Sequence, residues 1–234
     1  MLYINHERKA IFIHIPKTAG SYIANVLVKY YGFTNYLHLL ANKCPEHDEI
    51  CKTNEFPIVL TGNPKYDNSF FNKFTGILKY CQMSEYINKM CNMDADKWNE
   101  YFKFCFIRHP YSRAISAWKH IKQIFPNSLP FDEYIRQNKY FVSNIEYGHI
   151  FMSQLIHITD ISGKCGMNMI GRFEHLEEDL EIILNKIGFR QIIHNKKIIN
   201  SSKNFTLKID RKMLRIMNYL FSDDFRYFRY KMVL

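Results

Sequence analysis

Residues 11–22, IFIHIPKTAGSY, constrain the fold of this chain more than any other stretch. The apolar residues at its start predict a buried β-strand, residues 16–20 predict a tight loop, and an amphipathic helix follows. Such a loop directs backbone N–H groups, a helix N-terminus and the Lys17 ammonium at a single anion. The segment therefore predicts a binding site for a phosphate or sulfate group.

This loop differs from the common nucleotide-triphosphate motif G-x-x-x-x-G-K-[ST]. In that motif the lysine follows the second glycine, whereas here Lys17 precedes Gly20. A second interpretation of the loop stays open. It is a turn initiated by Pro16, with a solvated lysine and with Ser21 as the helix N-cap.

A second candidate anion site lies in the segment FIRHPYSRAISAWKH. Arg108 ends a strand of buried type, where a guanidinium is costly unless it meets an anion. Ser116 follows eight residues later, on the next helix, where its hydroxyl could join Arg108 on one phosphate. The alternative is that Arg108 pairs with an internal carboxylate and that Ser116 is a small packing residue.

Strands alternate with helices along the chain, which predicts an α/β fold around a mainly parallel sheet. We find no repeat or linker, so residues 1–234 are interpreted as one domain. Ligands of such sheets bind where strand C-termini meet helix N-termini, and Lys17 and Arg108 lie at two such junctions. The predicted strands are 10–15, 57–61, 103–107 and 168–173, and the predicted helices are 21–31, 113–124, 175–187 and 210–221.

Composition sets weaker limits. Lys and Arg number 32 against 22 acidic residues, and this surplus fits either an anionic partner or simple solubility. The six cysteines include no C-x-x-C pair and no zinc spacing; Cys105 is expected in the core, and a Cys44–Cys51 disulfide has no support. Without a signal peptide or an apolar span, the expected location is the cytoplasm or another soluble compartment, unless a native N-terminal anchor was removed.

The two anion motifs together resemble sulfotransferases that use 3′-phosphoadenosine-5′-phosphosulfate (PAPS), specifically the carbohydrate sulfotransferase branch. There a P-K-[TA]-[AG]-[GS]-[ST] loop precedes F-x-F-x-R-N-P-[YW]-D-R-x-x-S, and here the matching stretches are HIPKTAGSY and FKFCFIRHPYSRAISAW. The similarity continues in residues 169–189 and 223–230. The resemblance implies a three-layer, P-loop-NTPase-like domain, in which helices flank a central, mainly parallel sheet.

The resemblance also implies roles for individual residues. Arg108 and Ser116 would bind the 3′-phosphate, and no metal would be needed. Arg172 and residues 200–203 are further candidates on the nucleotide side, although Arg172 could instead pair with Glu174 or Glu177. The residues implied to bind the 5′-phosphosulfate are Lys17, Thr18, Ala19, Gly20, Ser21 and Tyr22.

Sulfuryl transfer needs charge compensation on the leaving group and a base for the acceptor hydroxyl. We assign the first role to Lys17. Relatives often carry a histidine base between the first helix and the arginine strand, but residues 62–63 and 80–82 contain none. Asn and Asp of the family motif are also replaced, by His109 and Ser112. The base candidates are His38, His47, Asp67 and Glu85, of which we favour His38.

The sequence thus favours a PAPS-dependent sulfotransferase that acts on a hydroxyl, with a glycan, anionic or neutral, as the expected acceptor. One alternative is an inactive relative that keeps nucleotide binding, suggested by the missing histidine. Another is a small-molecule kinase, although no magnesium-binding Ser/Thr follows a G-K pair. A nucleic-acid module fits least, because Lys and Arg are scattered along the chain.

Overall fold

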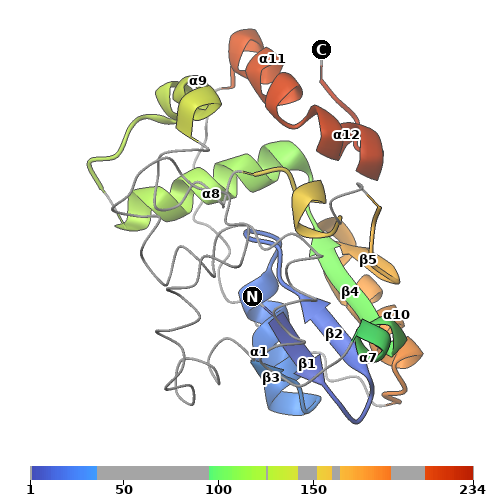
Figure 1. Ribbon diagram of the computed structural model, residues 1–234. Helices are drawn as coiled ribbons and strands as arrows, with labels where there is room; N and C mark the ends of the chain where they lie inside the picture. The colour runs from blue at the N-terminus through green and yellow to red at the C-terminus, as the bar shows by residue number, and fades with distance from the viewer. Residues whose placement is uncertain are drawn as a thin grey trace, which may run out of the picture.

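The computed structural model describes residues 2–35, 95–124, 126–141, 152–159, 164–190 and 209–233. In these residues, five strands form one sheet in the order β3-β1-β2-β4-β5 (Figure 1). The predicted strand 57–61 lies outside the described residues. The strands are β1 (Leu2–Asn5), β2 (Ala10–Ile13), β3 (Thr34–Asn35), β4 (Phe102–Ile107) and β5 (Met169–Arg172).

The centre of the sheet is parallel and its β1–β3 side is antiparallel. Strand β4 pairs in parallel with both β2 and β5, with Ile13 opposite Cys105 and Ile107 opposite Arg172. Strand β1 pairs antiparallel with β2 and with β3. The predicted α/β class is therefore confirmed as a mixed sheet flanked by helices, and β1 and β3 are additions that the sequence did not predict.

The predicted helices 21–31, 113–124, 175–187 and 210–221 correspond to α1, α8, α10 and α11. Helix α8 begins at Pro110, three residues before its predicted start, because proline suits the first position of a helix. Helices α7, α9 and α12 were not predicted. The bounds are α1 (Gly20–Tyr30), α7 (Ala95–Glu100), α8 (Pro110–Ile124), α9 (Phe131–Phe141), α10 (Leu176–Lys186), α11 (Arg211–Leu220) and α12 (Ser222–Phe228).

The ends of these helices follow local rules. Gly32 and Gly188 have φ angles of 66° and 89°, which a glycine adopts without strain just after α1 and α10. Asp210 caps α11, because its side chain accepts a hydrogen bond of 2.7 Å from the Met213 N–H. The residues that end or begin these helices can therefore be recognised in the sequence itself.

Apolar side chains cover both faces of the sheet. On one face, Phe12 and Phe104 pack against α1 and α10 through Ile23 and Ile183. On the other face, residues of β1, β2 and β4 pack against Trp98, Ile158 and Phe228. A third cluster joins α8, α9, α11 and α12, which lie together beyond the end of the sheet (Figure 1). Cys105 is a buried core residue, as predicted, and Trp118 and Ile121 of α8 are buried as well.

The parallel strands bring three segments to one edge of the sheet. The loop after β2 contains Lys17, β4 is followed directly by Arg108, and β5 leads into residues 173–175. Because neighbouring parallel strands end on the same side, these segments meet although they are far apart in the sequence. This edge is the candidate site.

Candidate anion-binding site at the carboxyl edge of the sheet

The loop between β2 and α1 has an unusual backbone. Lys17 and Ala19 have φ angles of 68° and 66°, in the left-handed region that non-glycine residues rarely occupy. Ala19 is the N-cap of α1 and offers no side-chain acceptor, so the first N–H groups of the helix have no capping side chain. Left-handed residues followed by a helix start form a concave set of N–H donors suited to an anion.

The loop packs too tightly for a side chain at Gly20. A Cβ atom built there would lie 1.7 Å from Cδ2 of His14, whose ring stacks on Phe12. Burial lowers the pKa of His14 to about 3, and the Lys17 charge contributes a smaller lowering. His14 is therefore neutral at physiological pH, and its ring packs directly against Gly20 at the start of α1.

Two of the predicted loop residues, Thr18 and Tyr22, take structural roles through their side chains, and Ser21 does not. The buried Thr18 hydroxyl donates to the Ile15 carbonyl at 2.9 Å, which closes the loop on itself. The Tyr22 hydroxyl donates to Glu177 at 2.7 Å and ties α1 to α10. Ser21 is exposed and is not the N-cap, so the capping interpretation is wrong, because α1 begins one residue earlier.

Arg108 lies beside this loop. Its Nη1 donates to the Lys17 carbonyl at 3.5 Å and its Nε to the Ser112 hydroxyl at 3.0 Å. The guanidinium also stacks on the Phe173 ring, 3.9 Å from its centroid. The structure thus brings Lys17 and Arg108 together, because β2 and β4 pair in parallel and end at the same edge of the sheet.

Among the described residues no carboxylate pairs with Arg108, so the alternative of an internal ion pair finds no support there. Burial lowers the pKa of Arg108 and the Glu174 charge opposes this lowering, but the Glu174 carboxylate is bound elsewhere. It accepts hydrogen bonds from the His109 N–H at 2.7 Å and from the Tyr230 hydroxyl at 2.9 Å. Ser112 also replaces the expected aspartate without leaving Nε of Arg108 unpaired.

Two neighbouring cations give the site its electrostatic character. Burial lowers the pKa of Lys17 to about 8, and the charge of Arg108 adds to the lowering. Burial also lowers the pKa of Arg108. Both groups would be stabilised by an anion between or beside them, because an opposite charge favours the charged form of each.

Ser116 lies on α8 one turn beyond Ser112 and is half-buried. Residues four apart share a helix face, so Ser116 extends the face that holds the Arg108 side chain. Its hydroxyl makes no hydrogen bond to another described residue, and its predicted role at a phosphate stays a prediction.

Arg172 adopts neither arrangement proposed from the sequence with Glu174 or Glu177. Its Nη2 donates to the Phe228 carbonyl at 2.6 Å, and its guanidinium lies 4.6 Å from the Tyr230 ring centroid. It therefore attaches β5 to the chain after α12. The remaining site candidates, His38, His47, Asp67, Glu85 and residues 200–203, lie outside the described residues, as do Cys44 and Cys51.

Three residues of the site were missed by sequence reasoning. The buried Arg113 donates to the Pro16 carbonyl at 3.0 Å and to the Met152 carbonyl at 2.7 Å. The side-chain amide of Gln154 forms hydrogen bonds with both the backbone N–H and the carbonyl of Arg108. His120 lies close enough to Lys17 for the lysine charge to lower its pKa, after burial. Arg113 carried a signal as the second arginine of the family motif, and His120 follows it by two helical turns on the same face, whereas Gln154 carried none.

The described residues contain no group of three or more His, Cys, Asp or Glu side chains arranged to hold a metal ion. None of the helices described is long and apolar enough to cross a membrane.

Comparison with known proteins gives the family. The model of the sulfotransferase family matches residues 1–231. Carbohydrate sulfotransferase 10 of Xenopus laevis is 25% identical, over 58% of this chain and 49% of the relative, so the match spans about half the length of that protein. No solved structure matches. Because the family model matches residues 1–231 of the 234, the chain belongs to the sulfotransferase family.

Proposed function

We propose that this chain transfers a sulfuryl group from PAPS to a hydroxyl group of a carbohydrate. The observation that carries the proposal is the contact between two cationic segments, in which Arg108 Nη1 donates to the Lys17 carbonyl at 3.5 Å. A donor with two separated anionic groups suits such a pair. Family membership supports the reaction type, and the name of the Xenopus relative supports the carbohydrate acceptor.

The loop after β2 fits the 5′ end of this donor. Its left-handed residues Lys17 and Ala19 turn N–H groups toward one anion, and the absence of a side chain at Gly20 lets the helix start approach His14. Arg108 and Ser116 would bind the 3′-phosphate one strand away. The donor supplies an activated sulfuryl group on a phosphate leaving group.

In this proposal the chain's own residues handle charge and protons. Lys17 would donate to the oxygen that gains negative charge as the sulfur–oxygen bond breaks. The acceptor hydroxyl gives its proton to a base, for which His38 remains our prediction. His120 is a second candidate, because its lowered pKa keeps the imidazole neutral and able to accept a proton at pH 7.

The test is replacement of Lys17 by alanine. We expect kcat for sulfate transfer to a glycan panel to fall by about 100-fold or more, since one charged donor to the leaving group is lost. The matched control is Lys29→Ala, at the far end of α1, which should keep the wild-type rate. Circular dichroism checks the fold of both variants.

The outcomes separate the alternatives. Wild-type rates in Lys17→Ala would overturn the role of this lysine. Binding of adenosine 3′,5′-bisphosphate without transfer to any acceptor would favour an inactive nucleotide-binding relative. Magnesium-dependent ATP turnover would instead favour a kinase.

A further inference from the structure

The backbone of Arg108 is held by a side chain from a distant segment. Gln154 is fully buried, and its Oε1 accepts from the Arg108 N–H at 2.8 Å. Its Nε2 donates to the Arg108 carbonyl at 2.9 Å. One side-chain amide thus forms hydrogen bonds with both the N–H and the carbonyl of Arg108, the residue that directly follows β4. This arrangement fixes the direction in which the Arg108 side chain leaves the sheet.

Gln154 is in turn held by Asp224 of α12. The Asp224 carboxylate is fully buried, and its Oδ2 accepts from the Gln154 backbone N–H at 3.0 Å and from Nε2 at 3.2 Å. Both Nε2 protons are therefore used, one for Asp224 and one for Arg108. Only one orientation of the amide satisfies these partners, because the carboxylate needs a donor and the Arg108 N–H needs an acceptor.

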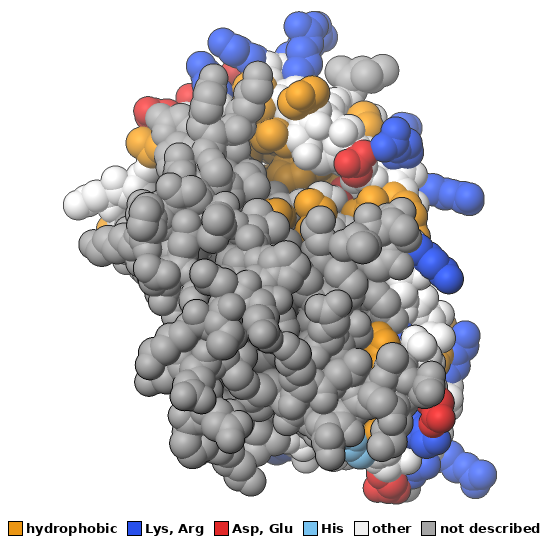
Figure 2. All heavy atoms as spheres, in the orientation of Figure 1, with side chains coloured by type: hydrophobic (Ala, Val, Ile, Leu, Met, Phe, Trp, Pro, Cys, Tyr) orange, Lys and Arg blue, Asp and Glu red, His pale blue; other side chains and the backbone are white. Residues whose placement is uncertain are grey.

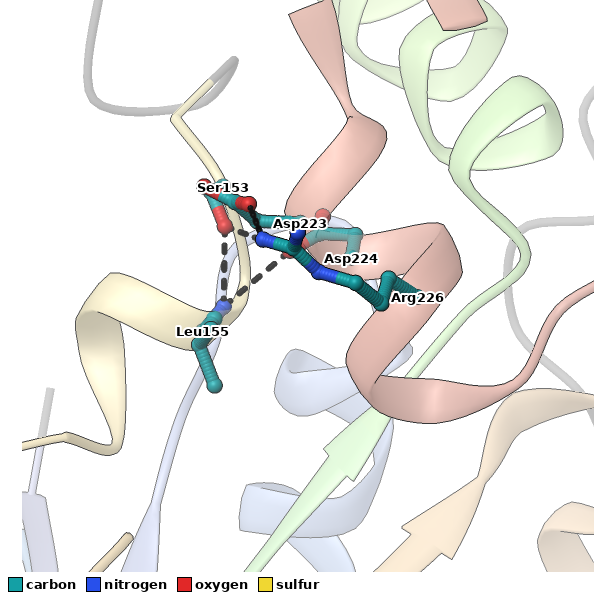
Figure 3. Close-up of polar contacts among 5 residues, drawn as sticks. All are labelled: Ser153, Leu155, Asp223, Asp224 and Arg226. Carbon is teal, nitrogen blue, oxygen red and sulfur yellow. Dashed lines mark hydrogen bonds and ion pairs between the residues drawn. The ribbon is translucent and has the colours of Figure 1, made fainter. Parts of the chain in front are cut away.

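The other oxygen of Asp224 holds the residues on either side of Gln154. Oδ1 accepts from the Ser153 hydroxyl at 2.5 Å and from the Leu155 N–H at 3.2 Å (Figure 3). Asp223, the neighbour of Asp224, pairs instead with the exposed Arg226 and takes no part in this cluster. Four donors around one buried carboxylate compensate its charge and leave the segment little freedom.

We infer that Gln154 and Asp224 are positioning residues that aim the Arg108 guanidinium at the 3′-phosphate of the donor nucleotide. The inference rests on the proposed function. The side chain of Arg108 is supported separately, by Ser112 and by the Phe173 ring. The amide of Gln154 supports the backbone, so that Arg108 is oriented before the nucleotide arrives and loses less conformational freedom on binding.

The test compares two nucleotides that differ only in the 3′-phosphate. Calorimetry measures adenosine 3′,5′-bisphosphate and adenosine 5′-monophosphate binding to wild type and to Gln154→Ala. We expect the variant to lose about tenfold or more in affinity for the bisphosphate and to bind the monophosphate as wild type does. In an Arg108→Ala background, Gln154→Ala should cause no further loss, because the two residues act as one unit.

Asp223→Asn is the matched control. It weakens the exposed ion pair with Arg226 beside Asp224 and leaves the cluster around Gln154 intact, so it should preserve the ratio of the two affinities. Gln154→Met, which fills similar space, repeats the measurement if the alanine variant does not fold. An unchanged affinity ratio in the Gln154 variants would overturn the inference alone. Failure of the wild type to bind either nucleotide would overturn the proposed function as well.

Discussion

At the scale of single residues, Lys17 combines a strained backbone with a destabilised charge. Its φ angle is left-handed, and burial with the nearby Arg108 charge lowers its pKa to about 8. Both features cost stability in the unliganded chain. An anion bound at the loop would offset this loss of stability, because it would accept hydrogen bonds from the surrounding N–H groups and favour the protonated form of Lys17.

This lowered pKa predicts the pH dependence of binding. The protonated lysine binds the anion, so affinity for adenosine 3′,5′-bisphosphate should fall as pH rises above about 8, by up to tenfold per unit. Binding above that pH should take up a proton, because the bound anion raises the pKa of Lys17. Calorimetry in buffers of different ionisation enthalpy measures both effects.

Lys17→Arg is the control for this pH profile. An arginine stays charged throughout the range, so the affinity of that variant should be flat across the same pH values. The folded-state pKa of Lys17 also lies below its unfolded value. Its contribution to stability therefore improves as pH rises from about 8 to about 10.5, in the opposite sense to its contribution to binding. An affinity that rises with pH would contradict this assignment.

At the scale of elements, α8 is the helix that organises the site. Its first turn holds Ser112 and Arg113, which bind the Arg108 side chain and the Pro16 carbonyl. Seven residues after Arg113, two turns along the same face, comes His120. The face of α8 that touches the anion loop thus also carries an imidazole near Lys17.

If His120 rather than His38 is the base, His120→Ala should lower kcat by about 100-fold, since a general base contributes at least that much, while affinity for adenosine 3′,5′-bisphosphate stays unchanged. Single-turnover sulfate transfer measures the effect. His38→Ala, made in parallel, is the comparison variant. A drop in kcat confined to His38→Ala would return the role of base to His38.

The elements also show what periodicity can and cannot predict. Helix α10 was predicted because its apolar residues repeat at helical spacing and Gly188 ends it, and α11 because Asp210 caps it. Strands β1 and β3 have four and two residues, too few to show a pattern, and they exist because they pair across the sheet. Helix α12 has only seven residues, and the hydrogen bonds of its buried Asp224 attach it to Ser153 and Gln154.

At the scale of the whole molecule, Arg113 joins three segments. It is 2% exposed, and it connects α8 to the Pro16 carbonyl before the anion loop and to the Met152 carbonyl before Gln154. Burial lowers its pKa to about 10, and the Asp224 charge partly opposes this lowering.

The exposed Lys and Arg side chains have a different distribution. Those visible on the described surface spread around its margins rather than forming one patch (Figure 2).

Arg113→Met should consequently destabilise the fold by about 2–4 kcal/mol, because it leaves the buried Pro16 and Met152 carbonyls without their donor and removes a positive charge that interacts with the buried Asp224. Urea denaturation measures the free energy of unfolding. Arg215→Met, an exposed change on α11, is the control and should stay within about 0.5 kcal/mol of wild type. Equal stability of the two variants would show that Arg113 does not hold these segments together.

The sequence by itself determined the strand–loop–helix with Lys17 and the strand end with Arg108. Spacing, turn residues and the rule for parallel sheets place each of them at a strand–helix junction, whereas the pairing of β2 with β4 in the tertiary structure brings the two together. Only the tertiary structure decided which of these side chains make contacts within the fold and which are left for the proposed anion. The hydroxyls of Thr18 and Tyr22 donate to Ile15 and Glu177. Gln154 and Arg113 hold the backbone of Arg108 and of Pro16. For most of these side chains the partner lies tens of residues or more away, and pairing at that distance follows from packing rather than from any local pattern.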